Sequence, residues 1–313
     1  MFGQIVVGVN DRKGGHDAIA LARKLMGKGG RLTVGHVLTR DPYVYRGASA
    51  RYAAAEPARR LNECEEEGAL ALLESTSAQA QLGELGLEFT LRWVRSRSVG
   101  RGLHELAETV RADLLVLGSS RQSLIGRVRI GDDTRAALNG APCAVAIAPV
   151  GYSARAVVAR EIGVGYNGSP ESEHALRVAR ELAREWDVKL SAFTAVSVPT
   201  SAFGPEELSL SDAIDPLVRD ASERIDALGG VEPHAAYGTA VEELTMYSAS
   251  LDLLVVGSRD YGPIGRLVHG STCGRLAHTA RCPLLVLTRA ARAAETSAGS
   301  GAKEQQSAAV ARE

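Results

Sequence analysis

Two short segments carry the residue types best suited to bind a phosphate group. Gly257 ends an apolar run, and Gly270-Ser271-Thr272 begins a predicted helix a short way along the chain. Glycines let a ligand approach the backbone closely, and unpaired N–H groups at the start of a helix attract a phosphate. The segment is not a Walker A loop, because the chain has no G-x-x-x-x-G-K-(S/T) pattern. The alternative is that Gly257 and Gly270 serve only as turn glycines.

The same arrangement occurs a second time in the chain. Residues 112–121 read Ala-Asp-Leu-Leu-Val-Leu-Gly-Ser-Ser-Arg, and residues 251–260 read Leu-Asp-Leu-Leu-Val-Val-Gly-Ser-Arg-Asp. A further glycine and then a cysteine follow each block, and the matching residues are all 139 positions apart. A repeat of this length indicates two copies of a whole domain, since solenoid repeats are roughly 20–50 residues long.

The glycine-rich segments must be positioned by strands and helices that alternate along the chain. Short β-branched runs alternate with stretches of helical periodicity, which predicts an α/β fold. We expect two tandem α/β sandwiches, each with a five-stranded parallel sheet that carries helices on both faces. For the first half the predicted strands are Ile5–Val9, Leu32–Leu38, Glu88–Arg95, Leu114–Leu117 and Ala144–Ala148, and the predicted helices are Asp17–Met26, Leu61–Leu82, Gly102–Val110 and Asp132–Asn139.

The second half repeats this order, and its first helix begins with a capping serine, Ser169, followed by Pro170. We place the first domain at 1–150, the second at 158–289, and a disordered tail at 290–313, which is rich in alanine, serine and glycine. Along the sequence, the separation between the first strands of the two halves is longer than the separation between their fourth strands. The first half therefore contains an insertion, which we place at Thr39–Arg60.

Composition narrows the class of function. The 313 residues carry a formal net charge of −1, so there is no overall basic field, and we expect neither nucleic acid nor a membrane as a partner. The chain enters a predicted strand at once, with no basic leader and no apolar run long enough for a membrane span. Four widely spaced cysteines favour a reducing, cytoplasmic location without disulfides.

Several other kinds of site are disfavoured. Residues 163–168 match G-x-G-x-x-G, but the first two glycines lie inside a predicted strand and Asp187 precedes the next strand, so we expect no dinucleotide site. The seven histidines have no metal-ligand spacing, and no nucleophile with its base recurs in both halves. Cys143 and Cys282 precede apolar strands and are interpreted as buried small hydrophobes.

These motifs resemble those of the universal stress protein family in tandem form. The resemblance covers residues 2–150 and 160–289, and it rests on the Asp-Leu-Leu-Val-Val-Gly-Ser strand and on the Cys-Pro-Leu-Leu-Val-Leu ending at Cys282–Leu287. The family motif is G-x2-G-x9-G-(S/T) after the fourth strand, with an aspartate at the end of the first strand. The resemblance implies ATP binding, with the aspartate on the nucleoside side and the glycine loop on the phosphates.

In the second half the resemblance implies the better preserved site. Asn167 replaces the aspartate, Asp260 replaces the second glycine, and Ser271 is kept. Asp260 adds a negative charge beside the phosphates unless Mg²⁺ intervenes, or else it caps a turn and points to solvent. The candidate binding residues of this half are Asn167, Val196, Gly257, Arg259, Asp260, Gly270, Ser271 and Thr272.

In the first half the motif is more degenerate, and we expect weaker binding. Arg121 replaces the second glycine, where it could bind a phosphate, and Asp132 replaces the serine. The candidate residues of this half are Asn10, Val37, Gly118, Arg121 and Gly131.

Other arginines are less distinctive. Arg127 and Arg266 adjoin the glycine loops and are either phosphate ligands or surface residues. Arg95, Arg97 and Arg101 are expected to be exposed in a loop.

The sequence and the resemblance together predict a cytoplasmic stress-response regulator. It would bind ATP mainly through its second domain and signal by conformation or by contact with a protein partner. The alternatives are an interaction module of the same fold without a ligand, and a slow ATPase, for which we identify no general base and no catalytic residue. The resemblance also implies that Ala144–Ala148 and Leu284–Thr288 pair, which makes the chain an internal pseudo-dimer and leaves a homodimer of chains open.

Overall fold

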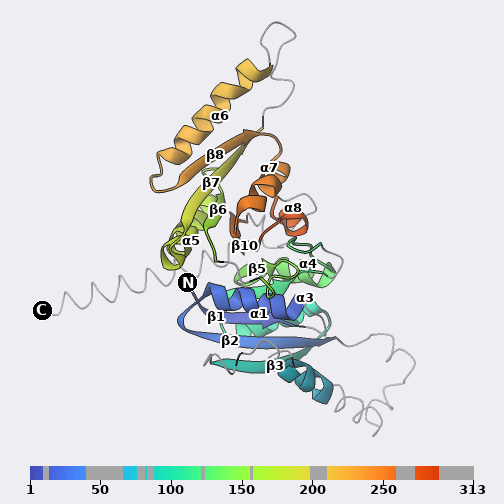
Figure 1. Cartoon of the computed structure of the whole chain (residues 1–313). Coiled ribbons are helices and arrows are strands. Elements are labelled where there is room, and N and C mark those ends of the chain that lie inside the picture. Colours follow the sequence, from blue (N-terminus) through green and yellow to red (C-terminus); the bar gives the residue numbers. More distant parts are fainter. Residues whose placement is uncertain are drawn as a thin grey trace, which may run out of the picture.

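The computed structural model describes residues 1–9, 14–39, 66–75, 82, 88–120, 124–155, 158–197, 210–258 and 272–288. These ranges form a single ten-stranded sheet in the order β3-β2-β1-β4-β5-β10-β9-β6-β7-β8 (Figure 1). The predicted tail, the insertion beyond Thr39 and half of the predicted helix Leu61–Leu82 lie outside the described residues. Within the described ranges, no helix combines the length and apolar character needed to cross a bilayer.

The first half supplies the strands on one side of this sheet, all of them parallel to their neighbours within the half. A further helix covers residues 66–75. The labelled elements are β1 (Phe2–Gly8), α1 (Gly14–Leu25), β2 (Met26–Thr39), β3 (Phe89–Ser96), α3 (Val99–Thr109), β4 (Leu114–Gly118), α4 (Asp132–Leu138) and β5 (Ala144–Ala148).

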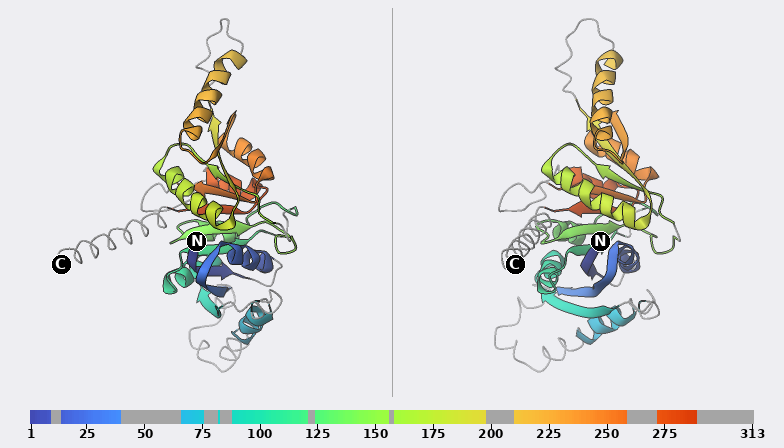
Figure 2. Two further views of the ribbon diagram at one scale, coloured as in Figure 1. Left: turned by 60° about the vertical axis from the view of Figure 1, so that its left-hand side comes forward. Right: turned by 90° about the vertical axis from the view of Figure 1, so that its left-hand side faces the viewer.

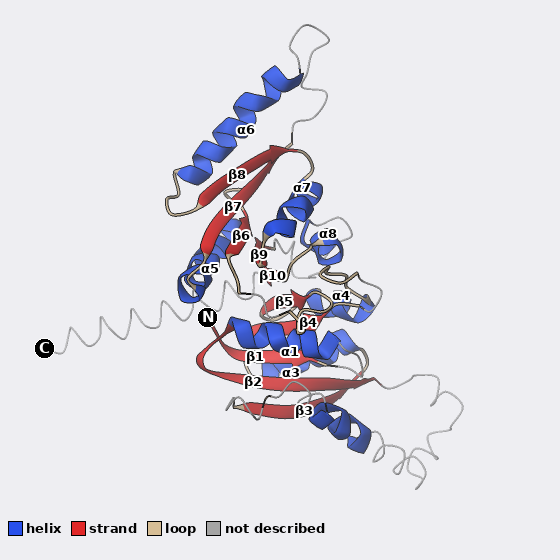
Figure 3. Cartoon of the chain, viewed as in Figure 1, coloured by secondary structure: helices blue, strands red, loops and turns tan. Residues whose placement is uncertain are grey.

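The second half repeats this arrangement with the same strand order and parallel pairing (Figure 3). The two five-stranded parallel halves of the sheet confirm the predicted fold class. The elements are β6 (Glu161–Gly165), α5 (Pro170–Trp186), β7 (Lys189–Val196), α6 (Leu210–Asp226), β8 (Glu232–Tyr237), α7 (Ala240–Tyr247), the short 3-10 helix η2 (Ser248–Ser250), β9 (Leu253–Gly257), α8 (Thr272–Thr279) and β10 (Leu284–Leu287).

Local signals set the helix starts. Ser169 caps α5 by accepting a hydrogen bond from the N–H of Ser172, with Pro170 in the first turn, as predicted. The helix predicted from Gly102 begins earlier, at Val99, because the Ser98 side chain accepts from the N–H of Arg101. Apolar periodicity alone misses such a start, since the first turn of α3 contains two glycines, Gly100 and Gly102.

The two halves join through their final strands. β5 and β10 pair in antiparallel register, with Leu285 opposite Ala146, and this confirms the pairing predicted for these strands. The two flanking pairs are Leu284 with Ile147 and Val286 with Val145, and each becomes the other when the repeat offset is applied. The contact therefore has the form of an isologous, two-fold interface.

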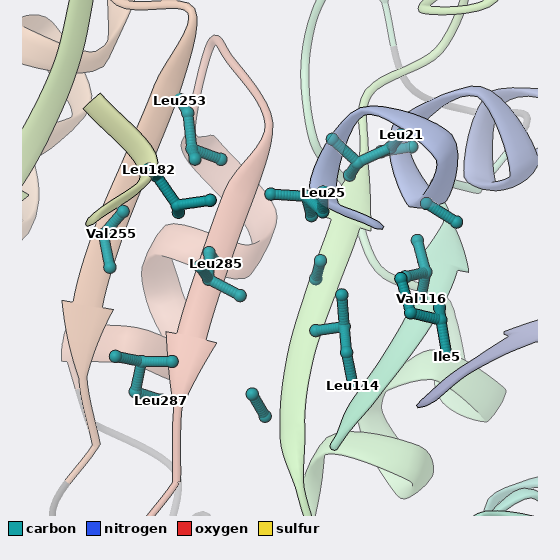
Figure 4. Close-up of a cluster of buried hydrophobic side chains, with 14 of the residues drawn as sticks. Ile5, Leu21, Leu25, Leu114, Val116, Leu182, Leu253, Val255, Leu285 and Leu287 are labelled. Carbon is teal, nitrogen blue, oxygen red and sulfur yellow. The ribbon is translucent and has the colours of Figure 1, made fainter. Parts of the chain in front are cut away.

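Two apolar layers run across both halves, one on each face of the sheet. Side chains of α1 and α5, the blue and yellow-green helices of Figure 2, belong to one layer, which also includes Ile225 of α6. Figure 4 shows side chains from both halves, among them Leu25, Leu114 and Leu285, within this layer. The opposite layer packs against α3, α4, α7 and α8. Because successive strand residues face opposite sides, β5 and β10 contribute to both layers.

An aspartate ties the fourth strand to the first strand in each half. The Asp113 carboxylate accepts from the N–H groups of Gly3 and Gln4, at 2.7 and 3.1 Å. The Asp252 carboxylate accepts from the equivalent N–H groups of Arg160 and Glu161, at 2.6 and 3.0 Å, both through Oδ2. The aspartate of the repeated Asp-Leu-Leu-Val segment thus has a structural function. Burial raises the pKa of Asp113, while the bonds from Gly3 and Gln4 oppose that shift.

Removing either aspartate should therefore destabilise the fold. Asp113→Ala and Asp252→Ala each leave two backbone donors without a carboxylate, and each should lower the free energy of unfolding by about 1–3 kcal/mol. Chemical denaturation measured by circular dichroism checks this. Asp226→Ala, at an exposed aspartate that ends α6, is the matched control and should change little. Wild-type stability in both Asp113→Ala and Asp252→Ala would contradict the structural function of these aspartates.

Candidate functional site

A pocket of about 170 Å³ lies at the carboxyl ends of β1, β2 and β4 in the first half. This is where open parallel sheets bind ligands. Three of the predicted residues, Val37, Gly118 and Gly131, line it together. The complete lining is Gly8, Val9, Gly14, Gly15, His36, Val37, Val99, Leu103, Leu117, Gly118, Ser119, Ser120, Gly131 and Thr134.

Hydrogen bonds fix the walls of this pocket. The His36 ring Nδ1 lies 2.9 Å from the carbonyl oxygen of Val9, which joins the ends of β1 and β2. The Ser119 hydroxyl donates to the carbonyl oxygen of Ala148 at 2.7 Å and accepts from the N–H of Arg129 at 3.3 Å. Sequence reasoning did not select His36 or Ser119, although Ser119 directly follows the motif glycine in the repeated block.

The loop that leads to Gly131 is held from two sides. On one side, the N–H of Ser120 donates to the carbonyl oxygen of Arg129. On the other, the N–H groups of Val128 and Ile130 donate to the carbonyl oxygens of Ala280 and Ala277, at 2.8 and 3.1 Å. Both of these alanines belong to the second half, so the second half helps to shape the pocket of the first.

A family model described as the universal stress protein family matches this chain twice, over residues 1–149 and 159–288. The chain belongs to the universal stress protein family. A universal stress protein of Mycobacterium tuberculosis is 26% identical over 233 residues, which cover 70% of this chain and 79% of that protein. A second one from the same species is 29% identical over 185 residues, or 56% of this chain and 61% of that protein.

Solved structures agree on the fold. A crystal structure from Pseudomonas aeruginosa, titled a universal stress protein, superposes with a TM-score of 0.60 at 18% identity and covers 92% of this chain and 93% of its own. One from Archaeoglobus fulgidus gives a TM-score of 0.59 at 17% identity over 91% and 98%.

The first glycine of the universal stress motif has a packing function in both halves. A Cβ placed on Gly118 would lie 2.1 Å from the carbonyl oxygen of Gly14, and one on Gly257 would lie 2.3 Å from that of Glu171. Gly14 and Glu171 occupy equivalent positions at the starts of α1 and α5. Neither motif glycine has a positive φ, so what each supplies is close helix–strand approach rather than a turn conformation.

Gly131 differs from these two. It is the N-cap of α4, with an extended backbone and no side-chain cap, and the nearest atom to an added Cβ would be 4.0 Å away. Packing therefore does not require a glycine here.

In the second half only part of the predicted site is described. Thr272 is the first residue of α8, and the thiol of Cys273 donates to the carbonyl oxygen of Gly257 at 3.4 Å. The Asn167 side-chain oxygen accepts from the N–H of Ser169 at 3.1 Å, so this exposed residue forms an Asx turn before α5. The predicted site residues outside the described ranges are Asn10, Arg121, Arg259, Asp260, Gly270 and Ser271.

Strand register shows that Val37 and Val196 are not at equivalent positions of the two halves. Gly8 pairs with Gly35, and its equivalent Gly165 pairs with Phe193, so Ala195 rather than Val196 corresponds to Val37. One residue along a strand changes the face to which the side chain points. Sequence comparison missed this one-residue offset because the two strands share no distinctive motif.

The interpretation of the arginines as exposed loop residues is confirmed for Arg97, which lies between β3 and α3, but it is wrong for Arg95 and Arg101. Arg95 belongs to β3, its side chain is only 18% exposed, and it pairs with Glu66 at 3.1 Å. Arg101 belongs to α3 and pairs with Glu105 at 3.0 Å. Arg127 is exposed beside the pocket loop, and Arg266 lies outside the described residues.

The cysteines are buried, as predicted for Cys143 and Cys282. Cys143, Cys273 and Cys282 are free thiols in the described chain. Burial raises the pKa of Cys143 to about 12, and it also raises the pKa of Cys282. Raised values keep these thiols protonated, which disfavours redox chemistry. No group of three potential metal ligands occurs among the described residues.

The different environments of the glycines give a direct test. Gly118→Ala should force α1 away from β4 and lower the free energy of unfolding by about 1–3 kcal/mol, as overpacked cores do. Gly257→Ala should act in the same way on α5. Gly131→Ala should cost less, about 1 kcal/mol or below, as at an ordinary N-cap. Thermal unfolding of the three variants measures the order, and equal losses at Gly118 and Gly131 would contradict the packing argument.

Proposed function

We propose that this universal stress protein is a cytoplasmic stress-response regulator that binds an adenine nucleotide, ATP in particular. The observation that carries the proposal is the pocket at the carboxyl ends of β1, β2 and β4. Residues chosen from the sequence and the family resemblance, Val37, Gly118 and Gly131, line this one pocket. Three candidates from separate parts of the chain thus meet where a ligand of this fold is expected.

The pocket suits one part of a nucleotide. At about 170 Å³ it is smaller than the roughly 300–1,000 Å³ typical of sites that enclose a whole ligand. Val9, Val37 and Leu103 give it apolar walls for a nucleobase. Ser119, Ser120 and Gly131 lie at its polar side, where we place the ribose and the first phosphate.

We propose that the second half binds the nucleotide more tightly. Asp132 follows Gly131 in the first half, and its exposed carboxylate is only partly compensated by Arg135, whose guanidinium donates to it at 2.8 Å. The equivalent residue in the second half is Ser271, which has no charge and can donate a hydrogen bond to a phosphate. Electrostatics therefore favour the second half for an anionic ligand.

Signalling by conformation follows from the hydrogen bonds between the halves. The loop that carries Gly131 donates to the carbonyl oxygens of Ala277 and Ala280 in the second half. A nucleotide that moves this loop would bias the position of α8, which offers a route to a protein partner. We further propose that the two halves correspond to the subunits of a dimer of single-domain family members, and that a homodimer of chains is possible.

We propose no catalytic activity. Among the described lining residues there is no carboxylate, and the Nδ1 of His36 is already directed at the carbonyl oxygen of Val9. The described lining therefore offers no carboxylate base for ATP hydrolysis.

The unequal halves can be tested by calorimetric titration with ATP and Mg²⁺. Ser271→Asp should remove most of the binding, because it puts a carboxylate where the phosphate is expected. Asp132→Ser should raise the occupancy of the first half. Asp220→Ser, at an exposed aspartate on α6, is the matched control and should have no effect. Equal occupancy of both halves in the wild type would contradict the proposed asymmetry, and no heat with ATP would exclude the nucleotide.

Metal dependence gives a second test, at Asp260. If this carboxylate faces the phosphates, wild-type binding should require Mg²⁺ or Mn²⁺. Asp260→Gly should then tighten ATP binding by about 1–2 kcal/mol, roughly tenfold, and lessen the requirement for metal. Titrations of both proteins with and without EDTA measure the difference. An unchanged affinity under both conditions means that Asp260 points to solvent.

A further inference from the structure

A second and larger cavity, of about 530 Å³, lies at the junction of the two halves. It shares no lining residue with the pocket at the carboxyl ends of the first half. One wall comes from α1 and from the segment after β5, and the other comes from the segments that precede β9 and β10. A cavity of this size falls in the range of small-molecule sites, which often occur at domain interfaces.

Four cationic side chains line this cavity: Arg23, Lys24, Arg155 and Arg281. Within the described chain none of them forms a salt bridge. Asp252 is the only carboxylate among the described lining residues, and its Oδ2 accepts the N–H groups of both Arg160 and Glu161. The cavity therefore concentrates positive charge that the described protein does not neutralise.

Two of the cations carry a cost that an anion would remove. The Nε of Arg281 is buried and has no hydrogen-bond partner, which is unfavourable for a charged donor. Lys24 lies 4.8 Å above the Trp186 ring, and burial lowers its pKa, although Asp252 opposes that shift. Like charges gathered in a partly enclosed space also repel one another.

Much of the remaining lining is apolar. Pro149, Tyr152, Leu251 and Pro283 offer a surface for an organic group. The wall after β5 is held by Asp17, whose buried carboxylate accepts from the N–H of Gly151 and from both the N–H and the hydroxyl of Ser153, at 2.7 to 2.9 Å. The site is thus organised before any ligand enters, which lowers the entropic cost of binding.

We propose that this junction cavity binds an organic phosphate, with the phosphate on the guanidinium groups of Arg281 and Arg23 and the organic part against Tyr152 and Leu251. Guanidinium groups suit phosphates because they donate two parallel hydrogen bonds to them. A bare inorganic ion would leave the apolar wall and most of the volume unused. The ligand touches both halves, so its binding stabilises their docked arrangement.

Calorimetric titration of the full chain with ribose 5-phosphate tests the proposal, with ribose as the uncharged probe. Ribose 5-phosphate should bind at one site per chain and raise the melting temperature, and ribose should do neither. The double variant Arg23→Gln/Arg281→Gln should weaken binding by about tenfold or more. Arg219→Gln, at an exposed arginine of α6, is the matched control and should keep wild-type affinity. If the double variant does not fold, the single variant Arg155→Gln serves in its place.

Three results would overturn the proposal. The first is the absence of binding, and the second is an equal loss of affinity in Arg219→Gln, which means nonspecific attraction. The third is that orthophosphate binds as tightly as ribose 5-phosphate, which would mean that the apolar wall contributes nothing to binding. Adenosine has no phosphate and reports the carboxyl-end pocket, so its binding should be the same in the wild type and in the double variant. A failure of the adenine nucleotide proposal is thereby distinguished from a failure of this one.

Discussion

Two short apolar strands, Ala144–Ala148 and Leu284–Leu287, would each be an unpaired edge if the halves were separate. Their antiparallel pairing removes both edges and buries every residue of the two strands. Edges of this kind are prone to uncontrolled association, so the pairing protects the chain as well as closing the fold. Both apolar layers cross this seam, which makes each half depend on the other for part of its core. The junction cavity and the hydrogen bonds from the Gly131 loop to α8 are further consequences of the same seam.

Much of this architecture could be predicted because the sequence contains its own comparison. A residue present in both halves at the repeat offset marks either a packing requirement or a binding requirement. Asp113 and Asp252 each tie the fourth strand to the first strand of their half through equivalent backbone partners. Cys143 and Cys282 are both buried. The final strands pair with their repeat equivalents because structurally equivalent apolar edges are self-complementary. The tandem α/β organisation therefore followed from the repeat, and the pairing of the final strands followed from the family resemblance.

What the sequence did not predict depends on contacts between distant segments. The junction cavity combines Arg23, Arg155 and Arg281, which come from a helix, an interdomain segment and a turn. No motif connects such positions, because their spacing is set only when the halves dock. Arg95 was misjudged for a related reason: its partner Glu66 belongs to a helix 29 positions earlier in the chain. The offset between Val37 and Val196 arose because strand register depends on pairing with neighbours and not on composition.

A glycine of the motif can be required by packing, by ligand binding or by both. Gly118 and Gly257 are required by packing, since any side chain there would meet the first turn of α1 or α5. Their presence would be expected even in a half that binds nothing, so by themselves they are weak evidence for a ligand. Gly131 is free of that constraint, and an alanine would fit. In the first half the argument for a nucleotide therefore rests on Gly131, which packing does not explain. In the second half it rests on the sequence motif Gly270-Ser271.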